Sequence, residues 1–274
     1  MNHDELSDSC FQELRALIHE MTGITIASNR KSLVQGRLRK RVLALALPSY
    51  EDYVLHLKTN HSEKQAFIDL VTTNETSFFR TPRVWDYIEK VFIPEWFGRH
   101  RDQRPLNIWS AAASSGEEAH SLGFLCQAFR ELHPSFSYSI LGTDISQEMV
   151  TACQAGFFEV KRVEDLKKNR PEYFLKYTRA ERGGVVVRPE IKTRLKFVRH
   201  NLFMALPTTE KFDLILLRNV LIYFTPEDQK KVIEKLEPRL TSEGVLIIGE
   251  SESLASIETD FKSIATLIYA KSAA

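Results

Sequence analysis

Beyond Pro105, short apolar segments alternate with helical patterns, and this alternation constrains the fold more than any other feature of the sequence. The apolar segments are LNIWSA, YSILGTD, FDLILLRN, GVLIIGES and IATLIYAK. Strands that alternate with helices in this way favour a mostly parallel sheet with helices on both faces. The sequence therefore predicts an α/β domain with a doubly wound sheet.

The alternation is interrupted between Phe157 and Asn201. The stretch GGVVVRPEIKTRLKFVRHN contains β-rich segments with no full helix between them. We expect a small antiparallel β insertion at about 157–196, whose last strand enters the main sheet.

The residues before this domain have helical patterns throughout. In SCFQELRALIHEMTG, apolar residues recur at helical spacing from Phe11 to Met21, and Gly23 ends the pattern. Further helices are predicted at about 29–47, from Ser49, at about 63–72, and from Pro82 to near Gly98. The predicted layout is an all-helical domain over residues 1–76 and the α/β domain over residues 77–274.

Composition indicates an ordinary cytoplasmic protein. The net charge of +1 over 274 residues gives no reason to expect nucleic acid or a membrane surface as a partner. Cys10, Cys126 and Cys153 are far apart and lack metal-ligand spacing, which fits a reducing compartment. The N-terminus has acids where a signal peptide needs basic residues, and no apolar run approaches the roughly 20 residues that span a bilayer.

The segment WSAAASSGEEAHS, residues 109–121, connects the first predicted strand to a helix. Ligands of doubly wound sheets lie beyond the carboxyl ends of the strands, so residues 110–118 are expected at a ligand. The turn has no G-x-G-x-x-G pattern, and Glu117 and Glu118 would repel a phosphate but attract a cation. S-adenosylmethionine (SAM) has an amino group and a sulfonium but no phosphate, and it fits this turn. Equally, the two acids could be ordinary partners of the helix dipole.

Polar residues also follow two later strands. Asp144 ends the second strand, where an acid accepts hydrogen bonds from ribose hydroxyls, although it could instead cap the next helix, as Ser146 could. Asn201 and Leu202 follow another strand, where an amide and a backbone N–H can read an adenine edge. A turn-forming asparagine is the alternative explanation.

Five segments together resemble one family, the chemotaxis-receptor glutamate methyltransferases of the CheR type. They are TTNETSFFR (72–80), WSAAASSGEEAHS, TDIS, HNLF and LRNVLIYF (217–224). The resemblance covers nearly the whole chain and implies a Rossmann-like class I methyltransferase that esterifies glutamates of chemoreceptor cytoplasmic helices with SAM. The positions that correspond to cofactor-binding residues are Asn74, Thr76, Arg80, Glu118, Asp144, Asn201, Leu202, Arg218 and Asn219. Tyr223 corresponds to a position beside the transferred methyl group.

The chain departs from the family pattern at Glu75, where an apolar or small residue is frequent, and at Ala119, where proline is frequent. Neither position contacts the ligand in the family. The family's β insertion can dock a peptide tether of the receptor. Here the segment YTRAERGGVVV is short, so we expect an enzyme that works without a tether.

The implied reaction requires positioning and electrostatics rather than a base. A glutamate side chain with a pKa of about 4.3 is already ionised at neutral pH. Arg80 could hold a carboxylate bidentately, either that of the substrate or that of the cofactor, or it could be a surface arginine. Tyr223 could line the methyl pocket or be a core aromatic. The eight histidines are scattered, so no metal site is expected.

The predicted helix at 29–47 carries only basic charges. Its apolar residues Val34, Leu38, Val42 and Leu45 share one face, and Arg30, Arg37, Lys40 and Arg41 form a neighbouring stripe. A solvated face is the plain explanation. The resemblance implies that this stripe binds the acidic helices of the receptor, and no aromatic residues interleave it as nucleic-acid binding would favour.

Other function classes stay open at this point. A regulatory module that senses SAM without catalysis, or a methyltransferase for RNA or a small molecule, could share the cofactor site. We expect a monomer that binds no nucleic acid and does not insert into the membrane.

Overall fold

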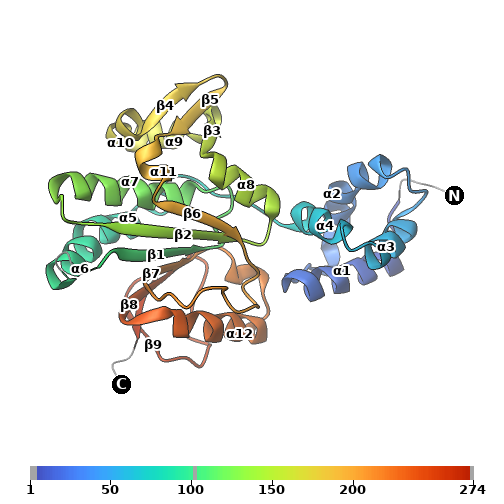
Figure 1. Cartoon of the computed structure of the whole chain (residues 1–274). Helices are drawn as coiled ribbons and strands as arrows, with labels where there is room; N and C mark the ends of the chain where they lie inside the picture. Colours follow the sequence, from blue (N-terminus) through green and yellow to red (C-terminus); the bar gives the residue numbers. More distant parts are fainter. Residues whose placement is uncertain (1–4, 101–103, 272–274) are drawn as a thin grey trace.

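The computed structural model describes residues 5–100 and 104–271, and Figure 1 shows two adjoining parts. The smaller part is all helical, and its buried apolar side chains, from Leu6 to Val71, form one cluster. The larger part mixes strands and helices, and its buried side chains, from Phe78 to Ile268, form a second cluster. The predicted fold class, a helical domain followed by an α/β domain, is therefore confirmed.

The helical part contains four α-helices and a short 3-10 helix, η1 (Ser28–Arg30). The α-helices are α1 (Asp8–Thr22), α2 (Lys31–Ala44), α3 (Tyr50–Thr59) and α4 (Glu63–Val71). Local sequence explains their ends. Ser49 caps α3 by accepting the N–H of Asp52 at 3.1 Å, and Gly23 ends α1 with a φ of 73°.

Helix α2 ends three residues earlier than predicted. The N–H of Leu47 donates to the carbonyl of Val42 at 3.1 Å, and the N–H of Ala46 donates to that of Leu43 at 3.0 Å. This is a Schellman motif, and Ala46 takes the left-handed conformation, with a φ of 52°, that glycine usually supplies. The sequence shows no stop signal before Pro48 because the residue at the turn is alanine.

The helix predicted after Pro82 is present, but its middle is widened. It consists of α5 (Pro82–Tyr87), a π-helical segment η2 (Ile88–Phe92) and α6 (Ile93–His100). Pro94 has no N–H for the carbonyl four residues before it, and its ring would clash with that carbonyl. The wide π turn immediately before Pro94 accommodates this loss.

A seven-stranded sheet forms the centre of the larger part, in the order β6-β2-β1-β7-β8-β10-β9. Its strands are β1 (Leu106–Ala111), β2 (Tyr138–Asp144), β6 (Leu195–Arg199), β7 (Phe212–Leu217), β8 (Leu240–Ile248), β9 (Phe261–Ala265) and β10 (Ile268–Lys271). The first five in the spatial order are parallel, and β10 runs antiparallel to both its neighbours. The doubly wound sheet is therefore confirmed.

The final segment differs from the prediction of one strand. IATLIYAK forms the end of β9, a turn, and β10, because Leu267 adopts a left-handed φ of 68° and reverses the chain. The residue at the turn is again not glycine, so the apolar pattern did not reveal the reversal.

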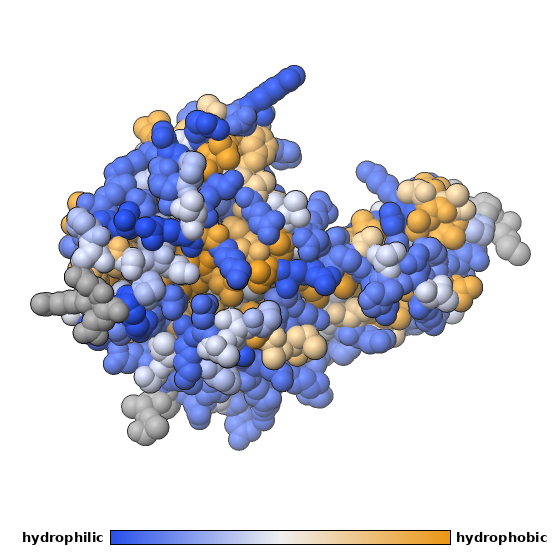
Figure 2. Space-filling view, viewed as in Figure 1, coloured by the Kyte–Doolittle hydropathy of each residue, from blue (hydrophilic) through white to orange (hydrophobic). Residues whose placement is uncertain are grey.

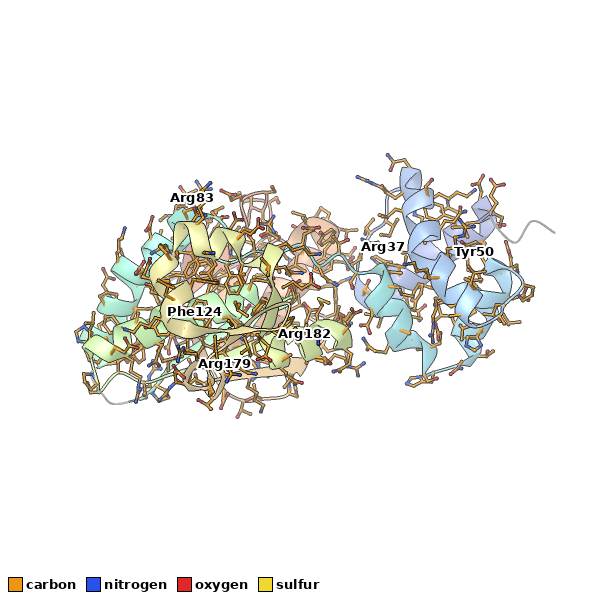
Figure 3. The ribbon with its side chains drawn as sticks, turned by 90° about the horizontal axis from the view of Figure 1, so that it is seen from above. Arg37, Tyr50, Arg83, Phe124, Arg179 and Arg182 are labelled. Atoms are coloured by element: carbon orange, nitrogen blue, oxygen red, sulfur yellow. The ribbon has the colours of Figure 1, made fainter. Side chains whose placement is uncertain are left out.

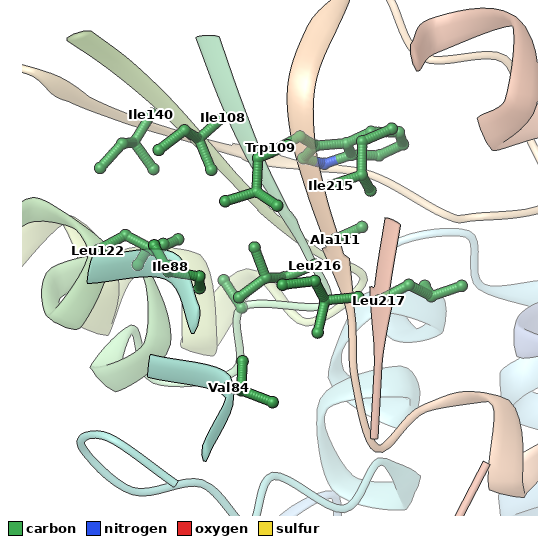
Figure 4. Close-up of a cluster of buried hydrophobic side chains, with 14 of the residues drawn as sticks. Val84, Ile88, Ile108, Trp109, Ala111, Leu122, Ile140, Ile215, Leu216 and Leu217 are labelled. Atoms are coloured by element: carbon green, nitrogen blue, oxygen red, sulfur yellow. The ribbon is translucent and has the colours of Figure 1, made fainter. Parts of the chain in front are cut away.

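The helices α7 (Glu117–Leu132), α8 (Gln147–Ala155) and α12 (Pro226–Leu236) complete this domain, with short 3-10 helices η4 (Leu221–Tyr223) and η5 (Glu237–Arg239). Side chains alternate between the two faces of the sheet. Figure 4 shows Ile108 of β1 facing Leu122 of α7, whereas Trp109 points to the opposite face. Both faces are thus buried, as a doubly wound sheet requires.

The insertion holds a small antiparallel sheet, in the order β3-β5-β4, that joins β2 to β6 along the chain (Figure 1). Its elements are β3 (Phe157–Glu159), η3 (Val160–Arg162), α9 (Glu164–Asn169), α10 (Pro171–Tyr177), β4 (Thr178–Glu181), β5 (Gly184–Val187) and α11 (Pro189–Lys192). The antiparallel insertion is confirmed, whereas the short helices α9 and α10 were not predicted. Tyr173 of α10 stacks on Phe79 at 5.6 Å between ring centroids, which anchors the insertion beside Arg80.

Hydrophilic residues cover most of the face shown in Figure 2. Among residues 5–100 and 104–271, no helix combines the length and the apolar composition needed to cross a bilayer. Within the same residues, no group of three or more His, Cys, Asp or Glu side chains could hold a metal ion.

Candidate active site

A cavity of about 930 Å³, including the open space at its mouth, lies at the carboxyl ends of β1, β2, β6 and β7. The strand order reverses between β1 and β7, and this is the point where doubly wound sheets bind ligands. Every residue that the family resemblance assigned to cofactor binding or catalysis lines this cavity. These residues are Asn74, Thr76, Arg80, Glu118, Asp144, Asn201, Leu202, Arg218, Asn219 and Tyr223.

The turn from β1 to α7 has left-handed backbone conformations at residues other than glycine. Ala112 and Ser114 have φ angles of 89° and 51°, in the left-handed region that side chains rarely adopt. The N–H groups of Ala112 and Ala113 donate to the carbonyl of Thr143 at 2.9 and 2.8 Å, and that of Ser114 donates to Asp144 at 2.8 Å. The neighbouring strand β2 therefore holds the strained turn.

Asp144 lies at the cavity wall and is 8% exposed. Its carboxylate accepts the N–H groups of Ser114 and Ser146 at 2.8 and 2.9 Å, while burial raises its pKa above the ordinary value. Ser146 caps α8 by accepting the N–H of Met149, so the capping alternative for Asp144 is wrong. A carboxylate offers about four acceptor positions, and capacity remains for a ligand hydroxyl.

Glu118 and Arg218 form a buried ion pair at the cavity, with 2.9 Å between Oε2 and Nη1. Glu118 also accepts the hydroxyl of Ser110 at 2.8 Å. The Nε of Arg218 is buried and has no hydrogen-bond partner among the described residues. An orphaned N–H beside a cavity is the kind of group that a ligand satisfies, so the donor set fits a cofactor bound here.

Glu117 is not part of this cavity, and the expectation that both acids of the turn meet a cationic ligand is wrong for it. Its carboxylate is fully buried and accepts Nε of Arg162, from the insertion, at 2.6 Å. The hydroxyl of Ser115 donates to it at 2.7 Å. A buried carboxylate is stable only with a partner of opposite charge. The ion pair between Glu117 and Arg162 therefore links the insertion to the turn after β1.

Asn201 forms a turn, as the alternative explanation predicted, and it also lines the cavity. Its Oδ1 accepts the N–H of Phe203 at 3.0 Å, which forms a turn, and its Nδ2 donates to the carbonyl of Met21 at 3.1 Å. The second contact links the end of α1 to the cavity wall. One amide hydrogen and one lone pair remain for a ligand, beside Leu202.

Arg80 is held rigidly at the junction of the two domains. Its carbonyl accepts Nε1 of Trp85 and Nη2 of Arg218, both at 2.8 Å. The flanking Phe79 and Thr81 have φ angles of 52° and 66°, which are strained conformations for such side chains. Among the described residues, no carboxylate forms an ion pair with its guanidinium, whose Nη1 donates to a backbone carbonyl. A fixed backbone thus presents an unneutralised cation to the cavity.

Tyr223 lies in η4, is half-buried and lines the cavity. Its carbonyl accepts the N–H of Thr25, from the segment after α1, at 2.8 Å. The side chain lines the cavity and also packs against the hydrophobic core of the α/β domain, so its role in methyl transfer stays a prediction.

Sequence reasoning missed further residues of the site, including Glu75, which it placed away from the ligand although it lines the cavity. Thr22 and Ile24 bring the end of the helical domain to the cavity, and no spacing along the chain indicates this. His200 precedes Asn201 and also lines the cavity, so it could have been found from its neighbour. Glu252, in the segment GES, contacts the backbone that carries Asn219, as described below.

Two of the four cations predicted to bind substrate are engaged within the helical domain. Arg41 donates from Nε to Glu63 at 2.9 Å, and Glu63 is only 2% exposed. Arg37 donates to the carbonyl of Val71 and, at 2.7 Å, to the hydroxyl of Thr73, and burial lowers its pKa. Arg37 and Arg41 are therefore only partly exposed, because the segment after α4 and a buried acid engage them.

Arg30 and Lys40 remain exposed. Figure 3 shows Arg37 on the side of the helical domain that faces the α/β domain. Since Thr73 lines the cavity, Arg37 connects α2 to the cavity wall rather than to solvent.

The fold and the site together define a class of protein. A doubly wound sheet with an acid after its second strand, an acid in its first helix and no phosphate cradle is the arrangement of a Rossmann-like, SAM-dependent methyltransferase. The chain belongs to the CheR methyltransferase family: its all-alpha domain model matches residues 10–72, and its SAM binding domain model matches residues 74–270.

Curated relatives match over nearly the whole chain. A chemotaxis protein methyltransferase of Klebsiella aerogenes is 35% identical over 268 residues, covering 93% of this chain and 87% of that protein. Its counterpart in Escherichia coli is 32% identical over 274 residues, covering 97% and 92%. Chemotaxis protein methyltransferase 1 of Vibrio cholerae is 31% identical over 264 residues, covering 94% of each.

Proposed function

We propose that the chain transfers the methyl group of SAM to glutamate side chains of chemoreceptor signalling proteins, which gives methyl esters. The observation that carries the proposal is the unneutralised guanidinium of Arg80 on the wall of a cavity with the donors and acceptors that SAM requires. The names of the relatives, chemotaxis protein methyltransferases, support receptors as the substrate.

The residues that would hold SAM divide by their chemistry. Asp144 would accept ribose hydroxyls, and Asn201 with the backbone of Leu202 would face the adenine. Glu118 would accept hydrogens of the amino group through lone pairs that Arg218 and Ser110 leave free. Asn74, Thr76 and Asn219 would complete the wall.

The cofactor supplies an activated methyl group on a sulfonium, so the chain needs no general base. The substrate carboxylate is ionised at neutral pH, and Arg80 orients one of its oxygens in line with the methyl carbon. The transfer would form the O–C bond while the electron pair of the S–C bond passed to sulfur, so that S-adenosylhomocysteine would be the leaving product. Tyr223 borders the space in which the methyl moves and helps to exclude water.

The helical domain would recognise the receptor through α2. Arg30 and Lys40 are exposed cations, and α2 carries no acid, so an acidic helix complements it. We propose a division into a recognition domain over residues 1–76 and a methyltransferase domain over 77–274. We also propose a cytoplasmic, monomeric enzyme that needs no receptor tether and binds no nucleic acid.

The test is transfer of labelled methyl from SAM onto membranes that contain receptor. The label should be released as volatile methanol by alkali, since carboxylate esters hydrolyse readily. Alkali-stable label would favour an RNA or small-molecule methyltransferase. Tight SAM binding without transfer to receptors would favour a sensing module.

Reversing Arg30, immediately before α2, and Lys40, within α2, in the variant Arg30→Glu/Lys40→Glu should raise the KM for receptor several-fold and leave SAM affinity unchanged. Exposed charges steer an acidic partner, and salt screens them beyond roughly 8 Å. Initial rates at low and high salt, with calorimetry of SAM, measure both effects. Reversal of Lys58, whose partner Glu13 is also exposed, is the control. If the wild-type and reversed proteins had equal KM values and equal salt dependence, the exposed cations of this region would have no role in binding the receptor.

The glycine at position 36 of α2 indicates that the backbone of a receptor helix approaches α2 closely at this point. Gly36 is exposed in the middle of the helix, and a Cβ added to it would have no atom within 4 Å. Packing inside the chain therefore does not explain why the residue is glycine. Glycine costs about 0.5–1 kcal/mol relative to alanine in a helix. Leu33 and Lys40 lie on the same face of α2.

Replacing Gly36 with alanine should therefore raise the melting temperature while raising the KM for receptor. The matched control is Gly98→Ala, in α6, which is equally exposed and free of contacts. It should gain stability without any effect on KM. A Gly36→Ala protein with an unchanged KM would show that no partner backbone meets α2 at this point.

A further inference from the structure

Glu252, which follows β8, accepts an unusual number of backbone hydrogen bonds. Its Oε1 accepts the N–H groups of Val220 and Leu221, both at 2.8 Å. Its Oε2 accepts those of Asn219 at 2.9 Å and Gly249 at 2.5 Å. The residue is 9% exposed, so four main-chain donors converge on one carboxylate that is largely withdrawn from water.

The segment after β7 has the geometry of an anion-binding nest. Asn219 has a left-handed φ of 59°, and the N–H groups of the three residues from Asn219 to Leu221 point to the same carboxylate. Such successive N–H groups make a concavity that binds anions. Here the carboxylate of Glu252 occupies the nest, and Glu252 itself does not line the cavity.

The nest leaves almost no room around this carboxylate. A Cβ on Gly249 would lie 2.7 Å from the backbone nitrogen of Asn219 and 2.7 Å from Oε2 of Glu252. Only glycine therefore allows β8 to approach so closely. Two residues hold the turn after β7 in place. Glu252 supplies the negative charge that accepts the N–H groups, and Gly249 leaves the space for it.

This turn presents much of the cavity wall. Arg218, Asn219 and Val220 line the cavity, and Tyr223 follows at the end of η4. We propose that Glu252 is a positioning residue of the cofactor site, which acts through the backbone of residues 219–221 to aim Asn219 and Tyr223 at the cofactor. The inference deepens the proposed function and rests on it only for the identity of the ligand.

The test variant is Glu252→Gln, which keeps the shape of the side chain but replaces one acceptor oxygen by a donor group. Two of the four N–H groups then face an NH₂ group and lose their acceptor. We expect at least a ten-fold loss of affinity for SAM and for S-adenosylhomocysteine in calorimetry. A loss of stability alone would lower the stoichiometry of binding and leave the dissociation constant of the folded protein unchanged, so the dissociation constant is the deciding readout.

Asp213 supplies the matched control, at the opposite end of the same strand, β7. It is 2% exposed, accepts both terminal nitrogens of Arg104 at 2.7 Å and accepts the N–H of Asn107 at 3.1 Å. Both Asp213→Asn and Glu252→Gln should lower the melting temperature. Asp213→Asn should leave the affinity for SAM unchanged. Equal affinity losses in the two variants would overturn the proposal in favour of general destabilisation.

Wild-type cofactor affinity in a folded Glu252→Gln protein would equally overturn it. If that variant fails to fold, Glu252→Asp decides, because it keeps the charge and shortens the side chain by one methylene, which withdraws the carboxylate from the four N–H groups. Affinity loss in a folded Glu252→Asp protein supports the proposal, and unchanged affinity contradicts it. A wild-type chain that binds SAM but methylates no receptor would contradict the proposed function and leave this inference standing.

Discussion

Replacing Arg80 with alanine is expected to lower kcat/KM for receptor methylation by about two orders of magnitude and to leave the fold intact. Removing one partner of a desolvated, hydrogen-bonded charge pair costs about 2–5 kcal/mol. The fold should survive because Arg80 supports its surroundings through its carbonyl, which accepts Trp85 and Arg218. Initial methylation rates, with melting curves for both proteins, measure the effect.

Two further variants separate the mechanism from its alternatives. Arg80→Lys should recover little activity, since an ammonium cannot reproduce the planar fork that holds a carboxylate. Arg83→Ala is the control, because Arg83 is an exposed arginine three residues later that pairs with the exposed Glu250. Near-normal turnover in Arg80→Lys would contradict bidentate holding of the carboxylate.

Asp144→Ala should weaken binding of SAM and S-adenosylhomocysteine by roughly ten- to hundred-fold. Hydrogen bonds to a charged acceptor are worth about 1.5–3 kcal/mol each. Helix α8 should keep its cap, because Ser146 provides it, whereas the N–H groups of Ser114 and Ser146 lose an acceptor and the melting temperature should fall. Calorimetry with a folded variant tests this, and unchanged affinity would remove Asp144 from the site.

The same residue predicts a pH dependence. Burial raises the pKa of Asp144, so it takes up a proton at a higher pH than an ordinary aspartate does. The protonated form accepts hydrogen bonds less well. Wild-type affinity for SAM should therefore fall as the pH falls through this raised pKa, and the Asp144→Ala protein should lack that fall. Parallel pH profiles would assign the effect to another group.

The strands and the acid at the end of β2 could be predicted from sequence because their signals are local. Apolar runs alternate with amphipathic helices, and the carboxyl ends of parallel strands meet at one edge of the sheet. This rule alone brings Asp144, Asn201 and Arg218 to one place. The motif resemblance added Asn74, Thr76 and Arg80, and the structure brings all of them to the same cavity.

Turns without glycine mark the limit of local signals. Ala46, Ala112, Ser114 and Leu267 take left-handed conformations, and in each case the neighbouring hydrogen bonds or strand pairing compensate the strain. The end of α2 and the hairpin of β9 and β10 were missed for this reason. No residue type at these positions announces the conformation.

The sequence by itself determined the fold class, the family and ten of the residues that line the cavity, from Asn74 to Tyr223. Only the tertiary structure decided which ion-pair partner each of two adjacent charged residues has. Glu117 and Glu118 are neighbours in sequence, yet one pairs with Arg162 of the insertion and the other with Arg218 after β7. A buried charge is defined by the partner that neutralises it. That partner lies 45 or 100 residues away along the chain, where no spacing rule reaches.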